Sequence, residues 1–303
     1  MIYYETGSTG ADLSADDLRQ GMVSALQKLG DRNKVLIVPP DYTRLPSRSG
    51  ELTEFCWEHL GDKVTDVLPA LGTHTPMTPG QISHMFGNTP PDLFRVHDWR
   101  NDIVTLGTVP AGFVSEVTGG ICDFTWPAQV NKLLVESGFD LILSIGQVVP
   151  HEVVGMANYN KNLFVGVGGA SAINESHFIG AAYGMERMMG RADTPLRRIL
   201  NRAQELFCGH LPLVFVLTVI GPRDDGSMAV RGLYVGDDVE CFEQAAELSV
   251  EVNFTVLDEE PQTMVVYLDP EEFHSTWLGN KAIYRTRMAI ADGGELIILG
   301  PEV

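Results

Sequence analysis

Two histidines and a lysine lie in a stretch that is rich in glycine and asparagine, between His151 and His177. An amphipathic helix or strand would show regularly spaced apolar residues, and this stretch does not. A buried strand is expected just before it, at 141–145, so His151 would lie at the carboxyl edge of a sheet, where open α/β folds bind ligands. Imidazole can act as a base, an acid or a metal ligand near neutral pH. The pattern therefore predicts a polar site around His151, Lys161 and His177.

The residues on either side of Lys161 also suggest a binding site. Gly168 and Gly169 follow it, and glycine lets backbone N–H groups approach an anion closely because it has no side chain and permits positive φ. Asn158 and Tyr159 precede it and could bond substrate hydroxyls, although an asparagine taken singly is more often a turn former. We therefore expect a bound cofactor in this segment.

Two further loops carry polar groups at the ends of expected strands. Arg44 lies in the sequence Asp-Tyr-Thr-Arg after the strand 34–39, and its planar guanidinium could hold a carboxylate through two parallel hydrogen bonds. A surface Asp–Arg pair is the structural alternative. His74 lies in the sequence Thr-His-Thr-Pro after the strand 64–71, and a lone loop histidine is usually solvated or caps a helix. Each loop is weak evidence by itself.

The order of the elements positions these loops. Strands and helices alternate over most of the chain, which favours an α/β fold with a mainly parallel sheet covered on both faces. We expect helices at 15–30, 50–60, 78–87, 126–136, 175–209, 238–250 and 276–291. We expect strands at 34–39, 64–71, 95–99, 102–109, 141–145, 211–221, 228–237, 263–269 and 295–299. The β-rich runs after residue 210 suggest a second α/β domain, so we predict domains at 1–209 and 210–303.

Composition excludes several classes of partner. The 303 residues carry a formal net charge of −19, which argues against nucleic acid or an anionic membrane surface as a partner. The four cysteines form no CxxC pair, so neither a disulfide framework nor a thiolate zinc site is expected, and a reduced cytoplasm fits best. The histidines lack the spacing of zinc enzymes. A zinc hydrolase is therefore the weakest candidate.

Taken together, these motifs resemble those of the nickel-dependent lactate racemase family, which includes other 2-hydroxy-acid racemases and epimerases. The similarity extends in order over most of the chain. It includes the segments 41–44, 71–78 and 150–151, then Lys161, His177 and Lys281.

The resemblance implies a specific chemistry. In that family a nickel-pincer nucleotide is tethered to the lysine that matches Lys161, and the histidine that matches His177 binds nickel. The residues that match His74 and His151 are the two acid/base groups. The residues that match Arg44 and Lys281 bind the substrate carboxylate. We expect Asp41, Thr43, Gly168 and Gly169 to contact the cofactor, and the enzymes that make the cofactor to be partners. The family also folds as two α/β domains, which implies an active site in the cleft between the two predicted domains.

The substrate is where the sequence departs from the lactate enzymes. Leu278 stands where the family has a glutamine, and Asn158, Tyr159 and Asn160 add hydrogen-bonding groups before Lys161. A sugar acid such as gluconate is therefore predicted over lactate, with malate or another short 2-hydroxy acid as the alternative. A non-catalytic cofactor-binding relative is the alternative to an enzyme, but it would need neither His74 nor His151.

Overall fold

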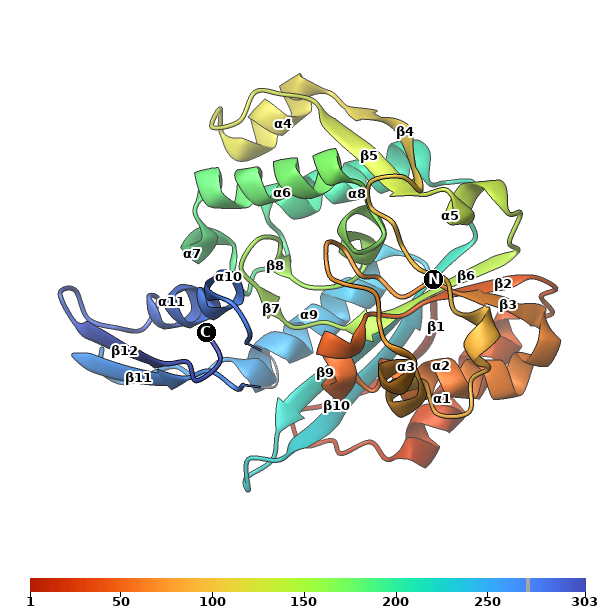
Figure 1. Ribbon diagram of the computed structural model, residues 1–303, viewed down its shortest axis with the longest axis horizontal. Coiled ribbons are helices and arrows are strands. Elements are labelled where there is room, and N and C mark those ends of the chain that lie inside the picture. Colours follow the sequence, from red (N-terminus) through yellow and green to blue (C-terminus); the bar gives the residue numbers. More distant parts are fainter. Residues whose placement is uncertain (271–272) are drawn as a thin grey trace. The chain divides into compact units, whose positions relative to one another are not determined.

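The computed structural model describes residues 1–270 and 273–303. Its centre is a six-stranded sheet in the order β1-β10-β9-β6-β2-β3 (Figure 1). Strand β10 is antiparallel to both of its neighbours, whereas β9, β6, β2 and β3 are parallel to one another. The strands are β1 Ile2–Gly7, β2 Val35–Val38, β3 Val64–Val67, β6 Leu141–Gln147, β9 Leu213–Pro222 and β10 Met228–Gly236. The predicted α/β fold with a mainly parallel sheet is confirmed.

Both faces of this sheet are buried. In β2 all four residues are fully buried, with Val35 and Ile37 in one apolar cluster and Leu36 and Val38 in the other. This alternation follows from the two-residue period of a strand. The first cluster includes residues of α1 Ala15–Leu29 and α2 Ser49–Leu60, and the second includes residues of α6 Ala170–Tyr183, α8 Pro195–Phe207 and α9 Val239–Asn253.

A separate antiparallel pair of strands, β4 Ile103–Val109 and β5 Trp126–Asn131, packs near α6 and α8 (Figure 1). The strand predicted at 102–109 is therefore present, but it lies outside the central sheet. The helix predicted at 126–136 is wrong, because only α5 Leu133–Glu136 is helical there. Trp126, Ala128 and Val130 are buried at alternate positions, which is the pattern of a strand. Residues 95–99 form no strand either.

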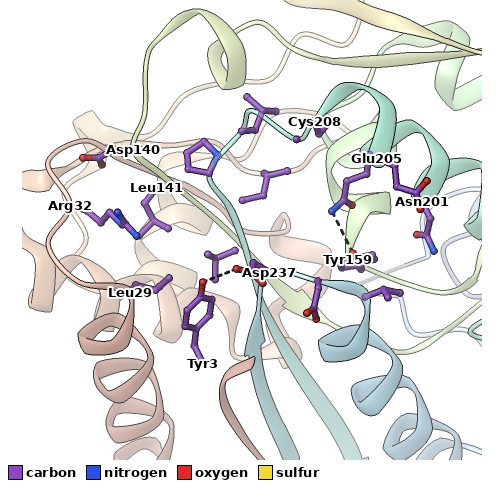
Figure 2. Close-up of a pocket in the computed structure, with 18 residues that line it drawn as sticks. Tyr3, Leu29, Arg32, Asp140, Leu141, Tyr159, Asn201, Glu205, Cys208 and Asp237 are labelled. Carbon is purple, nitrogen blue, oxygen red and sulfur yellow. Dashed lines mark hydrogen bonds between the residues drawn. The ribbon is translucent and has the colours of Figure 1, made fainter. Parts of the chain in front are cut away.

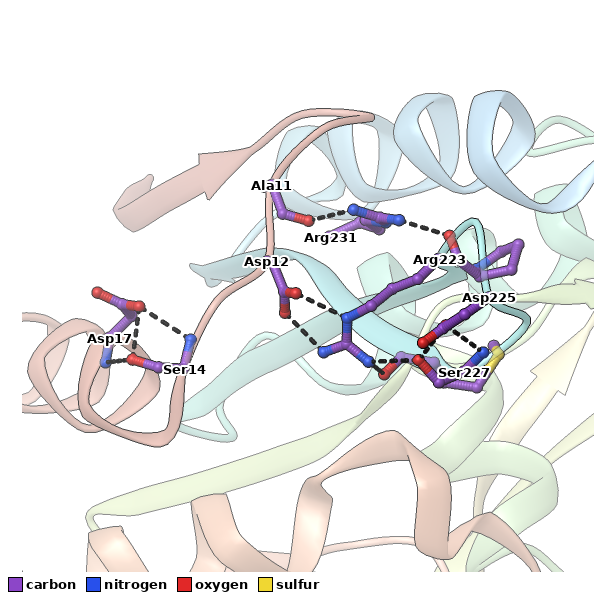
Figure 3. Close-up of polar contacts among 10 residues, drawn as sticks. Ala11, Asp12, Ser14, Asp17, Arg223, Asp225, Ser227 and Arg231 are labelled. Carbon is purple, nitrogen blue, oxygen red and sulfur yellow. Dashed lines mark hydrogen bonds and ion pairs between the residues drawn. The ribbon is translucent and has the colours of Figure 1, made fainter.

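Local capping fixes the start of the first long helix. Ser14 and Asp17 form a reciprocal capping box at the start of α1. Just before it, Asp12 accepts two hydrogen bonds from Arg223, at 2.7 Å from Nε and 2.8 Å from Nη2, which tie this segment to the β9–β10 hairpin (Figure 3). The predicted helix start at Ser14 is confirmed.

The remaining elements are short. They are η1 Tyr42–Ser47, η2 Gly61–Lys63, α3 Pro79–Phe86, η3 Pro91–Leu93, α4 Ala111–Thr118, β7 Pro150–His151, β8 Gly155–Met156, the π-helix η4 Asn162–Gly166 and α7 Met185–Met188. The region predicted as one helix at 175–209 is thus three helices. In the described part of the chain, no helix is both long and apolar enough to cross a membrane.

The chain divides into two compact units at a different place from the predicted boundary. The first unit contains 1–183 and 188–253, and the second contains 184–187 and 254–303. The predicted boundary at 209/210 lies inside the first unit, because β9 forms a parallel ladder with β6 in the central sheet. The second unit contains the parallel pair β11 Thr263–Tyr267 and β12 Glu295–Leu299, with α10 Thr276–Gly279 and α11 Lys281–Thr286.

Candidate active site

His74 and Asp41 form a hydrogen-bonded pair at the carboxyl edge of the central sheet. Asp41 follows β2, and His74 lies in the loop after the neighbouring parallel strand β3. The Nδ1 atom of His74 is 2.6 Å from Oδ2 of Asp41, and the hydroxyl of Thr43 donates to the other carboxylate oxygen at 2.6 Å. The aspartate side chain is 7% exposed and the histidine side chain 49% exposed. A buried carboxylate thus orients an imidazole at the rim.

The protonation of this pair follows from its surroundings. Burial raises the pKa of the Asp41 carboxyl, but the hydrogen bond from His74, the charge of His74 and the Thr43 hydroxyl together bring it below its ordinary value. Asp41 is therefore an anion at neutral pH and accepts a hydrogen bond from the protonated Nδ1 atom of His74. In a neutral imidazole this leaves the lone pair on Nε2, so His74 can accept a proton there.

His151 has the opposite arrangement. It lies in the short β7–β8 hairpin after β6, and its side chain is only 14% exposed. The backbone N–H of Val153 donates to its Nδ1 at 3.1 Å, so the proton of the neutral ring is on Nε2. Burial, followed by the charge of Lys161, lowers the pKa of His151 well below its ordinary value. His151 is therefore neutral at pH 7 and presents an N–H donor.

The charges around His151 show which predicted residues lie together. The charges of Lys161, Glu152, Arg44 and His177 all affect the pKa of His151. The charge of Arg44 also lowers the pKa of the Asp41 carboxyl group. Arg44 belongs to η1. The fold therefore brings residues predicted from four separate segments to one edge of the sheet.

The segment that carries Lys161 is held by hydrogen bonds from several elements. Lys161 immediately precedes the π-helix η4, a rare form that often occurs at functional sites. The side-chain amide of Asn162 donates to the carbonyl of Val38 in β2 at 3.1 Å and to the hydroxyl of Ser144 in β6 at 3.0 Å. The N–H of Gly72 donates to the carbonyl of Gly166 at 2.7 Å. The loops of His74 and Lys161 are therefore directly linked.

His177 is an exposed residue of α6. Its Nδ1–H donates to the backbone carbonyl of Ile173 at 2.7 Å, which leaves the lone pair of the neutral ring on Nε2. Histidines that bind metals usually have their second nitrogen held in this way. Among the described residues, no group of three His, Cys, Asp or Glu could hold a metal ion. A metal on His177 would therefore take its other ligands from a bound group.

Asn158 and Tyr159, predicted to bind substrate, are instead buried in the protein. Both have positive φ, at 65° and 57°. The Asn158 Oδ1 atom accepts the N–H of Tyr159 at 2.7 Å. The ring of Tyr159 packs against Phe215 and Phe242, and its hydroxyl accepts a hydrogen bond from Gln204 at 3.4 Å. Because these polar groups already have protein partners, the reason for predicting them as substrate contacts is wrong.

The buried residue His97 was overlooked as a component of the site. Its Nδ1 accepts a hydrogen bond from Asn131 at 3.0 Å, and its Nε2–H donates to the carbonyl of Gly168 at 3.0 Å. Burial lowers its pKa, so it remains neutral and keeps this orientation. Its place in an apparent strand, at 95–99, concealed this role. His97 therefore fixes the loop between Lys161 and His177.

At positions 168 and 169 the surrounding atoms leave no space for a side chain. Neither has the positive φ that we expected. A Cβ atom on Gly168 would lie 1.8 Å from the carbonyl oxygen of Phe164, and one on Gly169 would lie 2.5 Å from Oε1 of Gln129. Their cofactor contact stays a prediction, as does that of Thr43, whose hydroxyl bonds Asp41. Lys281 begins α11 in the second unit, and its substrate role also stays a prediction.

Gly168→Ala is expected to lower the free energy of unfolding by about 3 kcal/mol, because the backbone must move to relieve this overlap. Gly112→Ala is the matched control, since a Cβ atom there would meet nothing within 4 Å. Gly112 lies in α4, so its replacement should be neutral or stabilise by up to about 1 kcal/mol. Equal urea midpoints for the two variants would contradict the packing argument.

Comparison with known proteins identifies the family of the chain. Residues 19–188, more than half of the chain, match the family described as the lactate racemase N-terminal domain. The chain belongs to the lactate racemase family. A search of curated proteins gave no match.

Two solved structures are similar to this member of the lactate racemase family. The crystal structure of a Thermotoga maritima protein is 28% identical, with a TM-score of 0.84, over 95% of this chain and 71% of the other. The lactate racemase apoprotein from Thermoanaerobacterium thermosaccharolyticum is 20% identical, with a TM-score of 0.69, over 95% of this chain and 67% of the other. At that identity, the second comparison shows the shared fold alone.

Proposed function

We propose that the protein is a racemase or epimerase that inverts C2 of a 2-hydroxy carboxylic acid. The observation that carries the proposal is the pair of histidines with opposite proton arrangements at one sheet edge. His74 presents a lone pair and His151 an N–H, and the charge of Arg44 acts at both places. Family membership supports the reaction class. A carrier that only stored a cofactor would need neither arrangement.

Arg44 is the residue we assign to the substrate carboxylate. The whole chain has a formal charge of −19, so an anionic substrate needs a local cation. The guanidinium can hold a carboxylate in a fixed plane through two hydrogen bonds, and this leaves C2 and its hydroxyl in a defined position. Lys281 is our second candidate for this role.

The two histidines take different parts in moving the hydroxyl proton. His74 accepts the proton at Nε2, and the buried carboxylate of Asp41 stabilises the imidazolium that forms. His151 donates a hydrogen bond from Nε2 to the substrate oxygen. To accept a proton at Nε2, His151 must first carry its own proton on Nδ1 and give up the bond from Val153. The carboxylate of Glu152, 3.9 Å from Nδ1, would stabilise that form.

The residues present fit the nickel-pincer nucleotide that the resemblance implies. Lys161 would hold it covalently, and Nε2 of His177 would bind nickel, since Nδ1 is already occupied by the Ile173 carbonyl. His97 and the Gly168 loop hold the backbone between these two residues. When bound, the cofactor supplies a reversible acceptor for the hydrogen on C2 together with its electron pair. Exchange of that hydrogen between the two faces of C2 gives inversion.

The structure does not support the preference for one substrate within this class that the sequence suggested. The preference for a sugar acid over lactate depended on Asn158 and Tyr159, and both are committed to the core. We therefore propose the 2-hydroxy carboxylic acids as a class. Aldonates, malate and lactate form the panel to be compared by chiral analysis of the products.

Protein produced together with the cofactor-synthesis enzymes is expected to carry a mass adduct on Lys161 and to contain nickel. Lys161→Ala should lose the adduct and most of the nickel, because a single histidine holds the ion poorly. Lys63→Ala, at an exposed lysine of η2, is the matched control and should keep both. Intact mass and metal analysis test the cofactor without any assay of turnover. Nickel retained in full by Lys161→Ala would refute the tether.

A further inference from the structure

A pocket lies at the amino ends of the parallel strands of the central sheet, at the opposite end of these strands from the histidines. It is formed where β6 and β9 begin and where the antiparallel strand β10 ends, and its volume is about 540 Å³ (Figure 2). Pockets of this size commonly hold small molecules. The proposed reaction uses only the carboxyl edge of the sheet, so this pocket has no part in it.

One wall of the pocket carries a cation without a close partner. Arg32, in the loop between α1 and β2, makes no hydrogen bond or ion pair with any other described residue, and its Nε atom is buried without a partner. Its charge acts on Tyr3 and Asp140, which also line the pocket. Asp140 already accepts hydrogen bonds from Asn33 and Lys34. The guanidinium is therefore available to an anionic group.

Other parts of the lining offer hydrogen-bond acceptors. The Oδ1 atom of Asp238 and the Oε1 atom of Gln204 are buried and have no partner among the described residues. The other carboxylate oxygen of Asp238 accepts a hydrogen bond from the Met1 amino group. Glu205 adds another carboxylate to the lining. A buried acceptor without a donor costs about 1–3 kcal/mol, so a bound donor would be favoured. An ammonium group would donate hydrogen bonds to these acceptors and would offset the negative charge of the carboxylates.

Apolar side chains supply much of the remaining lining. They include Leu29, Leu141, Leu213, Val214 and the ring of Tyr159. Figure 2 shows Arg32 beside Asp140 and Leu141, with Asp237 and Tyr159 farther along the pocket. A ligand that reached from the arginine to the acceptors would place its middle against this apolar surface.

We propose that this pocket binds a small zwitterion, with a carboxylate on Arg32, an ammonium on Asp238 and Gln204, and an apolar body between them. Free amino acids and ω-amino acids have this chemistry. A monocarboxylate or an amine alone would satisfy only one part of the lining. The proposal does not depend on the reaction at the other edge.

The test is calorimetric titration of the full chain with leucine, phenylalanine and 6-aminohexanoate, in parallel with hexanoate and hexylamine. At least one zwitterion should bind at least about tenfold more tightly than both compounds that carry a single charge. Arg32→Met and Asp238→Asn should each weaken its binding by about tenfold or more. Arg19→Met, at an exposed arginine paired with Glu58, is the control and should bind like the unmodified protein.

Each other outcome would overturn the proposal. One is that no zwitterion binds at millimolar concentration. Another is that hexylamine binds as tightly as the best zwitterion, which would leave Arg32 without a role. The third is that Arg32→Met binds as well as Arg19→Met. Thermal melting of each variant, measured without ligand, shows whether a loss of binding reflects a loss of the fold.

Discussion

Replacing His74 by alanine is expected to lower kcat/KM for interconversion of the two enantiomers by about 10²–10⁴-fold. The variant loses the Nε2 lone pair that accepts the hydroxyl proton. Asp41→Asn should lower kcat/KM by about 10–100-fold, because a neutral amide stabilises the imidazolium less and no longer fixes its tautomer. The measurement is the initial rate in each direction by chiral analysis, on protein whose Lys161 adduct has been confirmed by mass.

His84→Ala is the matched control for this prediction. His84 lies in the nearby helix α3, and its ring is hydrogen-bonded to the hydroxyl of Tyr42 at 2.7 Å rather than to a carboxylate. Its replacement should leave kcat/KM within about twofold of the unmodified protein, as expected for a surface residue outside the site. If His74→Ala retained activity similar to His84→Ala in both directions, His74 would not be the base.

Arg197→Met is expected to lower the free energy of unfolding by about 3 kcal/mol. The Arg197 side chain is 2% exposed and donates to the carbonyls of Met156 at 2.7 Å and Asn158 at 3.2 Å, and to the side chain of Asn160. Burial lowers its pKa to about 9, and the guanidinium still bears its charge at neutral pH. Methionine would leave these buried acceptors without a donor.

Arg202→Met provides the comparison for Arg197→Met because it lies in the same helix, α8. Arg202 is exposed and pairs with Glu205 at the surface at 3.1 Å, an interaction worth about 0–1 kcal/mol. Urea unfolding of both variants measures the difference. Similar midpoints would mean that Arg197 does not stabilise the positive-φ residues that lead to Lys161.

The sequence predicts those parts of the fold in which local pattern and tertiary environment agree. The strands at β2, β6 and β12 and the helices α1 and α2 lie within two residues of their predicted bounds. Each is an apolar run or stripe that turn or capping residues delimit. In β5, by contrast, Trp126, Ala128 and Val130 pack at alternate positions, whereas the sequence predicted one helix over 126–136, of which only α5 is helical.

The residues proposed for the site were easier to select from the sequence than the contacts that support them. Residue types and strand-end positions alone were weak evidence for His74 and Arg44, and the resemblance to the lactate racemase family was needed to place them in one site with His151. The bond between Asp41 and His74 joins residues 33 apart in sequence, so no local pattern could reveal it. Tyr159 also could not be placed from the sequence, because it lies in irregular backbone at positive φ, next to the Asn158 carbonyl that accepts a hydrogen bond from Arg197. Side-chain direction in an irregular segment is decided by tertiary contacts.

The pairing of β1 with β10 has a consequence for biosynthesis. Tyr4 lies opposite Val235, so the first strand of the chain cannot take its place until more than two hundred further residues have been made. At about 5–20 residues per second, that delay is on the order of 10–50 s. Meanwhile β2, β3 and β6 can associate, because they lie within the first 147 residues. Strand β1 therefore stays unpaired while its partner strand is being made, and this edge of the sheet closes as a late step of folding.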